Sequence, residues 1–234
     1  DTVSRSMIFG VCGSTPWCKL DKVKFLCPVP GYDRHFAICA SLGIEMINID
    51  MLPTGPDMDA VEEAVKDPAV KGMWCVPVYS NPLGASLSDE CVRQLAALKP
   101  AANDFRLFWD NAYAVHKVYK QTKVLNILDE CKKTGNENMV YMFGSTSKIT
   151  MAGSGVAFFG ASEANVKFTE SQITAESISW DKMNMLRHVR YFKDFAGMKA
   201  HMKKHADIIR PKFDLVLGVL DKELSELGVG EWTK

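Results

Sequence analysis

The sequence predicts an α/β fold, with a mainly parallel sheet sandwiched by helices and long helices after it. Short apolar runs alternate with segments whose apolar residues recur at helical spacing, up to about residue 161. Strand, helix and strand in repeated order favour parallel pairing, with helices on both faces of the sheet. From about Glu163 the sequence is compatible with helix nearly to the stretch ELGVG, which covers residues 226–230.

Six apolar runs have the length and composition of buried strands, and three of them end in polar residues. The predicted strands are residues 23–29, 45–51, 72–80, 106–110, 140–145 and 155–161.

Three predicted helices lie between these strands, at residues 33–43, 56–67 and 88–98. Asp57 and Ser86 are candidate N-caps, and Ser86 with Asp89 matches a capping box. In the last third of the chain, Pro211 is expected to interrupt the helical sequence, and Gly197 to do so more weakly.

The composition argues against several classes of partner. Acidic and basic residues balance to a net charge of zero, which does not suggest a nucleic acid or an anionic membrane. No apolar run approaches the roughly 20 residues that span a bilayer. The seven cysteines are odd in number and form no CxxC pair, so we expect buried thiols and a cytoplasmic location. We expect no metal site.

Open α/β sheets bind ligands at the carboxyl ends of their strands, so the residues that close each strand are candidates for a site. Asn81 follows the strand 72–80, although Asn-Pro-Leu-Gly alone is more typical of a plain turn. Asp110 closes the strand 106–110 and Tyr113 follows it. A buried carboxylate needs a partner, which could be a cationic ligand or a helix terminus.

The strand 140–145 leads to Ser145, Ser147 and Lys148. We expect the lysine amine to be partly desolvated and therefore nucleophilic. With Asp110 and Tyr113 it meets the needs of pyridoxal 5'-phosphate: an amine for the aldehyde, a carboxylate for the ring nitrogen, hydrogen-bond donors for the phenolate oxygen and hydroxyls for the phosphate.

Three motifs in this order, YSNPLG, DNAY and STSK, resemble the fold-type-I pyridoxal-phosphate-dependent aminotransferases. The stretches PVPGYDRHFAI, FGSTSKIT and SWDKMNMLRHVRYF are similar to the MocR-associated branch of aspartate aminotransferases. The resemblance covers essentially the whole chain. It implies that residues 1–234 are a single cofactor-binding large domain, without the family's N-terminal segment and C-terminal small domain.

The resemblance also implies an activity, in which an amino acid, aspartate or glutamate, is transaminated with a 2-oxo acid through a Schiff base on Lys148. Asp110 would pair with the pyridinium nitrogen, and Asn81 and Tyr113 would hydrogen-bond the phenolate oxygen. Tyr32 matches the aromatic residue that stacks on the ring. The family builds its active site at a homodimer interface.

The phosphate would be faced by Ser145 and, less directly, by Ser147. The family usually carries an arginine about eight residues after the lysine, and here Gly155 aligns with it. The phosphate charge must then be neutralised from elsewhere.

Two alternatives stay open on the sequence. The same residues serve other pyridoxal-phosphate reactions, such as carbon–sulfur cleavage or decarboxylation. An aminotransferase-like domain also acts as the ligand sensor of MocR-type transcription regulators. In the family, the arginine that binds the substrate carboxylate lies in the small domain, outside this chain. No residue of this chain therefore indicates which substrate is preferred.

Overall fold

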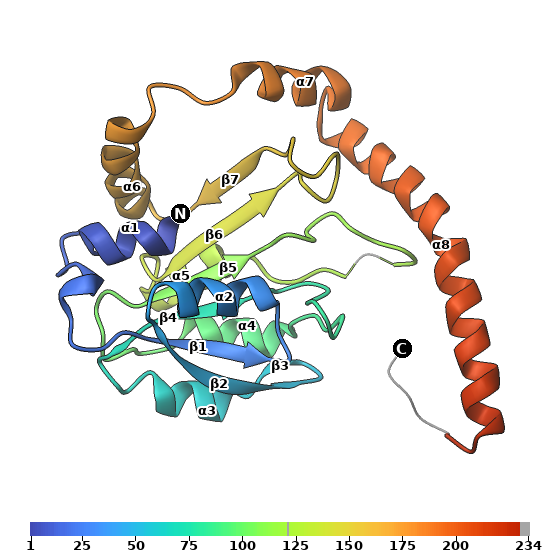
Figure 1. Cartoon of the computed structure of the whole chain (residues 1–234), viewed down its shortest axis with the longest axis horizontal. Helices are drawn as coiled ribbons and strands as arrows, with labels where there is room; N and C mark the ends of the chain where they lie inside the picture. Colours follow the sequence, from blue (N-terminus) through green and yellow to red (C-terminus); the bar gives the residue numbers. More distant parts are fainter. Residues whose placement is uncertain (121, 230–234) are drawn as a thin grey trace. The chain divides into compact units, whose positions relative to one another are not determined.

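The computed structural model describes residues 1–120 and 122–229, and it confirms the predicted α/β fold (Figure 1). Seven strands form one sheet in the order β3-β2-β1-β4-β5-β6-β7. The five central strands are parallel, while the short edge strands β3 and β7 run antiparallel to β2 and β6. The strands are β1 (Lys24–Val29), β2 (Glu45–Leu52), β3 (Gly55–Pro56), β4 (Val70–Cys75), β5 (Arg106–Asp110), β6 (Val140–Ser145) and β7 (Ala157–Gly160).

Side chains that alternate along each central strand build two cores, one on each face of the sheet. On β5, Leu107 and Trp109 enter one core while Phe108 enters the other. Helices α3 (Met58–Ala64), α4 (Asp89–Ala96) and α5 (Ile127–Thr134) cover the first face. Helices α1 (Thr2–Phe9) and α2 (Asp33–Ser41), with the short 3₁₀ helix η1 (Trp17–Lys19), cover the second. Burial on both faces explains why the strands are almost continuously apolar.

The strand predictions at 106–110 and 140–145 match β5 and β6 to the residue. The predicted strand 72–80 ends early, because the chain leaves the sheet after Cys75. Pro77 has no amide hydrogen to donate to a neighbouring strand. Its carbonyl instead accepts the Leu87 N–H at 2.9 Å, which closes the loop between β4 and α4.

Asp57 is confirmed as an N-cap, since its carboxylate accepts the N–H groups of Asp59 and Ala60. The Ser86 prediction is wrong. The N-cap of α4 is Ser88, whose hydroxyl accepts the Cys91 N–H at 3.1 Å, while the Ser86 hydroxyl accepts the Tyr79 N–H. Both serines precede the same apolar run. The sequence does not show which hydroxyl caps the helix and which one hydrogen-bonds within the preceding loop.

Three helices follow the sheet, α6 (Glu163–Glu176), α7 (Lys182–Phe192) and α8 (Phe195–Glu226). The prediction that Pro211 interrupts the helical sequence is wrong, because α8 continues through it. Gly197 does not interrupt it either. It lies in the first turn of α8, where a Cβ would stand 1.9 Å from the Phe192 carbonyl oxygen, so glycine permits a close approach to the end of α7.

The chain divides into two compact units. The first comprises residues 1–114 and 123–180 and contains the whole sheet with α1 to α6. The second comprises residues 115–122 and 181–234 and contains α7 and α8. Within the second unit, Arg210 donates to the Val118 carbonyl at 2.8 Å. The assignment of residues 1–234 to a single domain stays a prediction.

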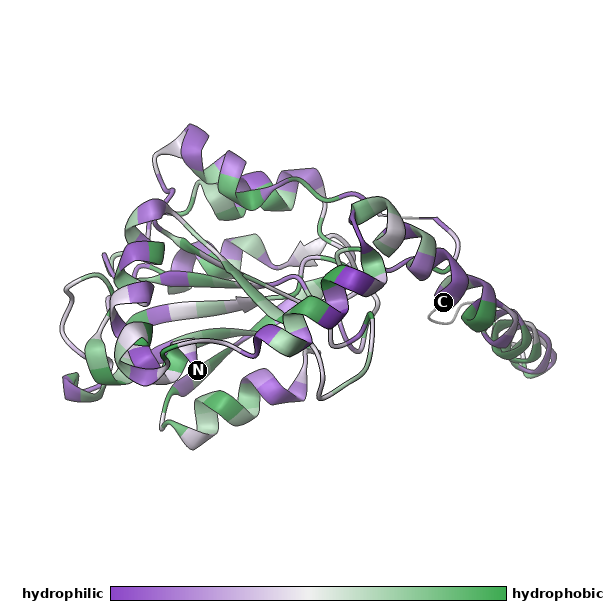
Figure 2. Ribbon diagram, turned by 90° about the horizontal axis from the view of Figure 1, so that it is seen from above, coloured by the Kyte–Doolittle hydropathy of each residue, from purple (hydrophilic) through white to green (hydrophobic). Residues whose placement is uncertain are grey.

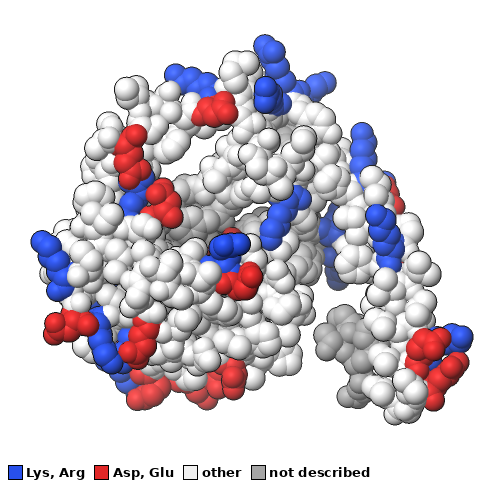
Figure 3. All heavy atoms as spheres, viewed as in Figure 1, with Lys and Arg blue, Asp and Glu red and all other residues white. Residues whose placement is uncertain are grey.

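The surface is mixed in polarity and in charge. Hydrophilic and hydrophobic residues alternate along α8, where Ile208 and Leu215 are exposed (Figure 2). Acidic and basic side chains are interspersed on the face shown in Figure 3. No helix among the described residues is both long and apolar enough to cross a membrane.

A buried carboxylate ties three elements together at the amino edge of the sheet. Asp104 accepts hydrogen bonds from Lys71 Nζ at 2.7 Å and from Trp17 Nε1 at 2.8 Å. Burial alone raises the pKa of Asp104, but the hydrogen bonds from Lys71 and Trp17 outweigh it, and the pKa lies below its ordinary value. The ionised carboxylate therefore stabilises the fold.

This contribution predicts a pH dependence of stability. Because the folded pKa of Asp104 is depressed, its contribution is present above the unfolded pKa, about 4, and is lost as the pH falls through the folded value. We expect Asp104→Asn to lower the free energy of unfolding at pH 7 by about 1–3 kcal/mol. The difference in the free energy of unfolding between wild type and variant, measured by urea titration, should be smaller at pH 3 than at pH 7. An equal gap at both pH values would contradict this role.

Candidate functional site

The carboxyl ends of β1, β4, β5 and β6 lie at one edge of the sheet, because these four strands are parallel neighbours. Strands β2 and β3 are added to one side of β1, and β4, β5 and β6 to the other side. Open α/β sheets bind ligands at such a switch point, which here lies between β1 and β4. Each of the four strands is followed by a segment that carries predicted site residues.

The structure brings Lys148 together with two tyrosines. The Lys148 Nζ donates a hydrogen bond to the Tyr113 hydroxyl at 2.5 Å. The same nitrogen lies 4.0 Å from the centre of the Tyr113 ring and 5.4 Å from the centre of the Tyr32 ring. Two tyrosines that are far apart in the sequence therefore lie beside the Lys148 amine.

The expectation that Lys148 is partly buried is wrong for the described chain, in which its side chain is exposed. The lysine lies on the turn that follows β6, three residues beyond the strand end at Ser145. A turn at the sheet edge holds a side chain in place without covering it. Among the described residues of unit 1, Tyr113 therefore orients this amine, but the side chain stays accessible to water.

Asp110 ends β5, and its partner is a histidine. The Asp110 Oδ2 lies 3.0 Å from Nε2 of His35, on α2. His35 is buried, stacks on Trp74 with ring centres 4.3 Å apart, and receives the edge of Tyr32 at 5.3 Å. The helix terminus that the sequence left open as a partner is not used. Packing on both sides of the imidazole fixes the direction of the carboxylate.

His35 has no role among the residues predicted from the sequence, although it lies within PVPGYDRHFAI. The available signal was its position three residues after Tyr32, in the first turn of a helix that follows the neighbouring strand. Its partner Asp110 is 75 positions away in the sequence. Only the pairing of β1, β4 and β5 brings the two together.

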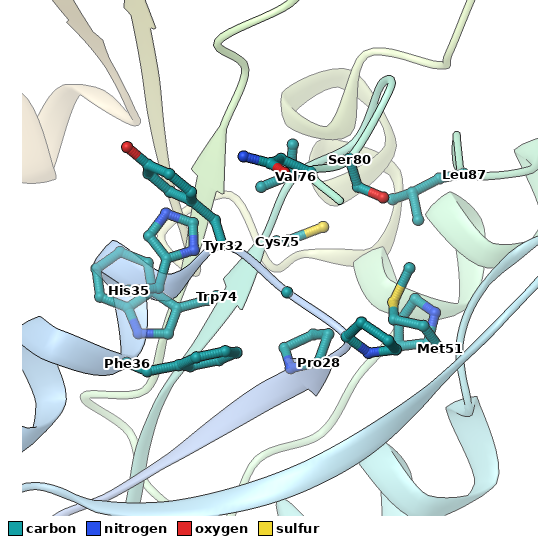
Figure 4. A pocket seen from close by; sticks show the side chains of 14 residues that line it. Pro28, Tyr32, His35, Phe36, Met51, Trp74, Cys75, Val76, Ser80 and Leu87 are labelled. Carbon is teal, nitrogen blue, oxygen red and sulfur yellow. The ribbon is translucent and has the colours of Figure 1, made fainter. Parts of the chain in front are cut away.

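Asn81 is exposed and shares a recess with Tyr32 and His35. Figure 4 shows Tyr32, His35 and Trp74 along one side of this recess and Ser80 and Leu87 on the opposite side. The Ser80 hydroxyl is buried without a hydrogen-bond partner among the described residues. Asn81 therefore lies at the same edge as the other predicted residues, in the recess that Tyr32 and His35 also line.

Ser145 and Ser147 form a pair. The Ser145 hydroxyl donates to the Ser147 hydroxyl at 2.7 Å and accepts the Ser147 N–H at 3.0 Å. A Cβ at Gly155 would lie 2.3 Å from the Ser147 Oγ and 2.8 Å from its nitrogen. A side chain at position 155 would therefore require the backbone of Ser147 to move.

Thiolate formation is not favoured at two buried cysteines of unit 1, Cys91 and Cys131. Burial raises the pKa of Cys91 to about 11 and that of Cys131 to about 12, so both stay protonated at neutral pH. Five of the seven cysteines are buried, as expected, while Cys12 and Cys18 are exposed. Among the described residues, no three His, Cys, Asp or Glu side chains are grouped to hold a metal ion.

The contact between Gly155 and Ser147 predicts a sharp difference between two glycines. Gly155→Ala should lower the free energy of unfolding by about 1–3 kcal/mol, because the backbone of Ser147 must move. Gly160→Ala is the matched control, since its Cβ would meet only Met142 at 3.9 Å. Urea denaturation measures both variants. Equal stability of the two would contradict the close approach.

Comparison with known proteins identifies the family. The family described as "Aspartate amino-transferase" matches residues 1–234. An aspartate aminotransferase from Corynebacterium glutamicum is 49% identical over 100% of this chain and 54% of its own length. A putative aminotransferase from Mycolicibacterium smegmatis is 46% identical over 100% of this chain and 55% of its own. The chain therefore spans about half the length of these curated relatives.

Solved structures agree with this assignment. An aspartate transaminase from Corynebacterium glutamicum has a TM-score of 0.96 at 49% identity and covers 100% of this chain and 56% of its own. A putative aminotransferase from Corynebacterium diphtheriae has a TM-score of 0.94 at 49% identity, over 99% of this chain and 57% of its own. The fold, the strand-end residues and these relatives together show that the chain belongs to the aspartate aminotransferase family.

Proposed function

We propose that this chain forms the cofactor-binding large domain of a pyridoxal-phosphate-dependent aminotransferase, and that the complete protein moves the amino group of aspartate or glutamate to a 2-oxo acid. The observation that carries the proposal is the Lys148 amine, held by Tyr113 beside the Tyr32 ring. The preference for aspartate rests on the relative from Corynebacterium glutamicum, which is an aspartate aminotransferase. Homodimeric assembly and a cytoplasmic location, which the resemblance implies, belong to the same proposal.

The chemistry of the donor set fits pyridoxal phosphate. Lys148 is the amine that would hold the aldehyde, Asp110 the carboxylate for the ring nitrogen, and Tyr32 the aromatic face for the ring. Ser145 and Ser147 are the hydroxyls for the phosphate. With Gly155 at the position that aligns with the family's arginine, the phosphate charge would be met by another group. When bound, the cofactor supplies a ring that accepts the electron pair of the substrate Cα–H bond.

Lys148 has two tasks in this proposal. Its amine would hold the aldehyde of the cofactor, and its Nζ would also be the base that takes the proton from the substrate Cα. The hydrogen bond to Tyr113 at 2.5 Å holds Nζ in one position for both tasks. A base that is fixed near the reacting atom contributes about 10²–10⁴-fold to the rate.

Asp110 keeps a proton on the cofactor ring nitrogen, and His35 holds Asp110 in place. The imidazole lies 3.0 Å from the carboxylate and is itself fixed by the Trp74 stack. Asn81, which lines the same recess as Tyr32, is assigned to the phenolate oxygen with Tyr113. Each of these side chains ends or follows a strand of the same sheet, so the set is rigid.

Sequence identity supports the alternative reactions less than it supports transamination. A pyridoxal-phosphate-bound carbon–sulfur lyase from Staphylococcus hominis has the same fold, with a TM-score of 0.66 at 18% identity, so the fold alone does not choose the reaction. Identities of 46–49% over the whole chain are to proteins named as aminotransferases, which favours transamination over lyase activity or ligand sensing.

The test is amino transfer by the complete protein. With pyridoxal phosphate, L-aspartate and 2-oxoglutarate, we expect oxaloacetate and glutamate in equal amounts and no ammonia. Lys148→Ala should lower the rate by about 10²–10⁴-fold, because the base is lost. Lys66→Ala, which removes an exposed lysine of unit 1, is the control and should not change the rate. Ammonia and pyruvate without glutamate would contradict transamination.

A further inference from the structure

The turn that carries Lys148 is closed by the chain that returns to β7. The pairing of β6 with β7 ends at Ser145 and Ala157. One step further, the Thr146 N–H donates to the Val156 carbonyl at 2.9 Å, and the Val156 N–H donates back to the Thr146 hydroxyl at 2.8 Å. Thr146 is 2% exposed. Thr146 and Val156 therefore continue the strand pairing by one residue pair.

In an antiparallel pair of this kind, both N–H groups normally donate to backbone carbonyls. The Thr146 carbonyl is already used, because it accepts the N–H groups of Ile149 at 2.9 Å and Thr150 at 2.8 Å in the turn around Lys148. The Thr146 hydroxyl takes the place of that carbonyl. The residue can thus end a strand and begin a tight turn at the same time.

Two contacts join this pair to the site. Ser147 follows Thr146 and packs against Gly155, which precedes Val156. Lys148 is the next residue, and its Nζ reaches Tyr113. Any shift of Val156 away from Thr146 therefore moves the serine pair and the amine relative to Asp110 and Tyr113 on the neighbouring segment.

We propose that Thr146 is a positioning residue of the cofactor site, whose hydroxyl fixes the turn that presents Ser147 and Lys148. The inference rests on the proposed function and deepens it, since it names what holds the amine and the phosphate-facing hydroxyls at a fixed separation. Thr146 touches neither substrate nor cofactor. It acts through the backbone of the turn.

Removal of the hydroxyl forces a choice between two hydrogen-bond arrangements. In Thr146→Val, which keeps the shape of the side chain, the Val156 N–H loses its acceptor. The Thr146 carbonyl can replace it only by releasing Ile149 and Thr150. We expect either change to shift the turn that carries Lys148. Thr146→Ser keeps the acceptor, and Thr146→Cys offers a weaker one.

The experiment compares these three variants in the complete protein, together with Thr134→Val as a matched control. Thr134 also loses a hydroxyl hydrogen bond, to the Ala96 carbonyl at 2.6 Å, but lies on α5. Three quantities are measured: the dissociation constant of pyridoxal phosphate, the pH at which the absorbance of the bound cofactor changes, and the urea midpoint of the cofactor-free protein.

We expect Thr146→Val to weaken cofactor binding about tenfold, the effect of one lost hydrogen bond, and to shift the pH of the absorbance change. Thr146→Ser should match wild type, and Thr146→Cys should lie between, which keeps the test decisive if the valine variant does not fold. Thr134→Val should lower only the urea midpoint.

Two results would overturn the proposal. One is a Thr146→Val variant that is less stable but has the wild-type dissociation constant and absorbance pH, since the hydroxyl would then be structural only. The other is a serine variant as impaired as the valine variant. A wild-type protein that does not bind pyridoxal phosphate would instead refute the proposed function, and this inference with it.

Discussion

Parallel pairing of β1, β4, β5 and β6 is the constraint from which the rest of the site follows. Because the four strands run in the same direction, the segments after each of them meet at one edge, whatever their distance in the sequence. Asp110 lies opposite Phe143 in the register of β5 and β6, which sets the height of the carboxylate relative to the Lys148 turn. Two apolar cores, one on each face, hold this register.

Polar groups at that edge are fixed by neighbours that take no part in chemistry. The imidazole of His35 is clamped between Trp74 and Tyr32 and holds Asp110. The absence of a Cβ at Gly155 lets the return segment approach Ser147. Asp110 and Ser147 thus depend on packing or on a backbone contact behind them, as residues of a preorganised site do.

Much of this could be predicted from sequence, because apolar runs and motif order are local patterns. The strands 106–110 and 140–145 are confirmed to the residue, and Lys148 and Tyr113 do meet. Several of the errors concern contacts that no local pattern in the sequence shows. Ser88 caps α4 because Ser86 is engaged by Tyr79, and the burial of a lysine at a strand end depends on what covers the edge. The His35 partnership with Asp110 has no local pattern at all. Roles on the cofactor stay predictions.

The central claim is that Lys148 binds the aldehyde of pyridoxal phosphate. The most direct measurement is borohydride reduction of the complete protein in the presence of the cofactor, followed by proteolysis and peptide mass spectrometry. The account predicts a phosphopyridoxyl mass on Lys148 and on no other lysine. An unmodified Lys148, or a label spread over the exposed lysines, would contradict it.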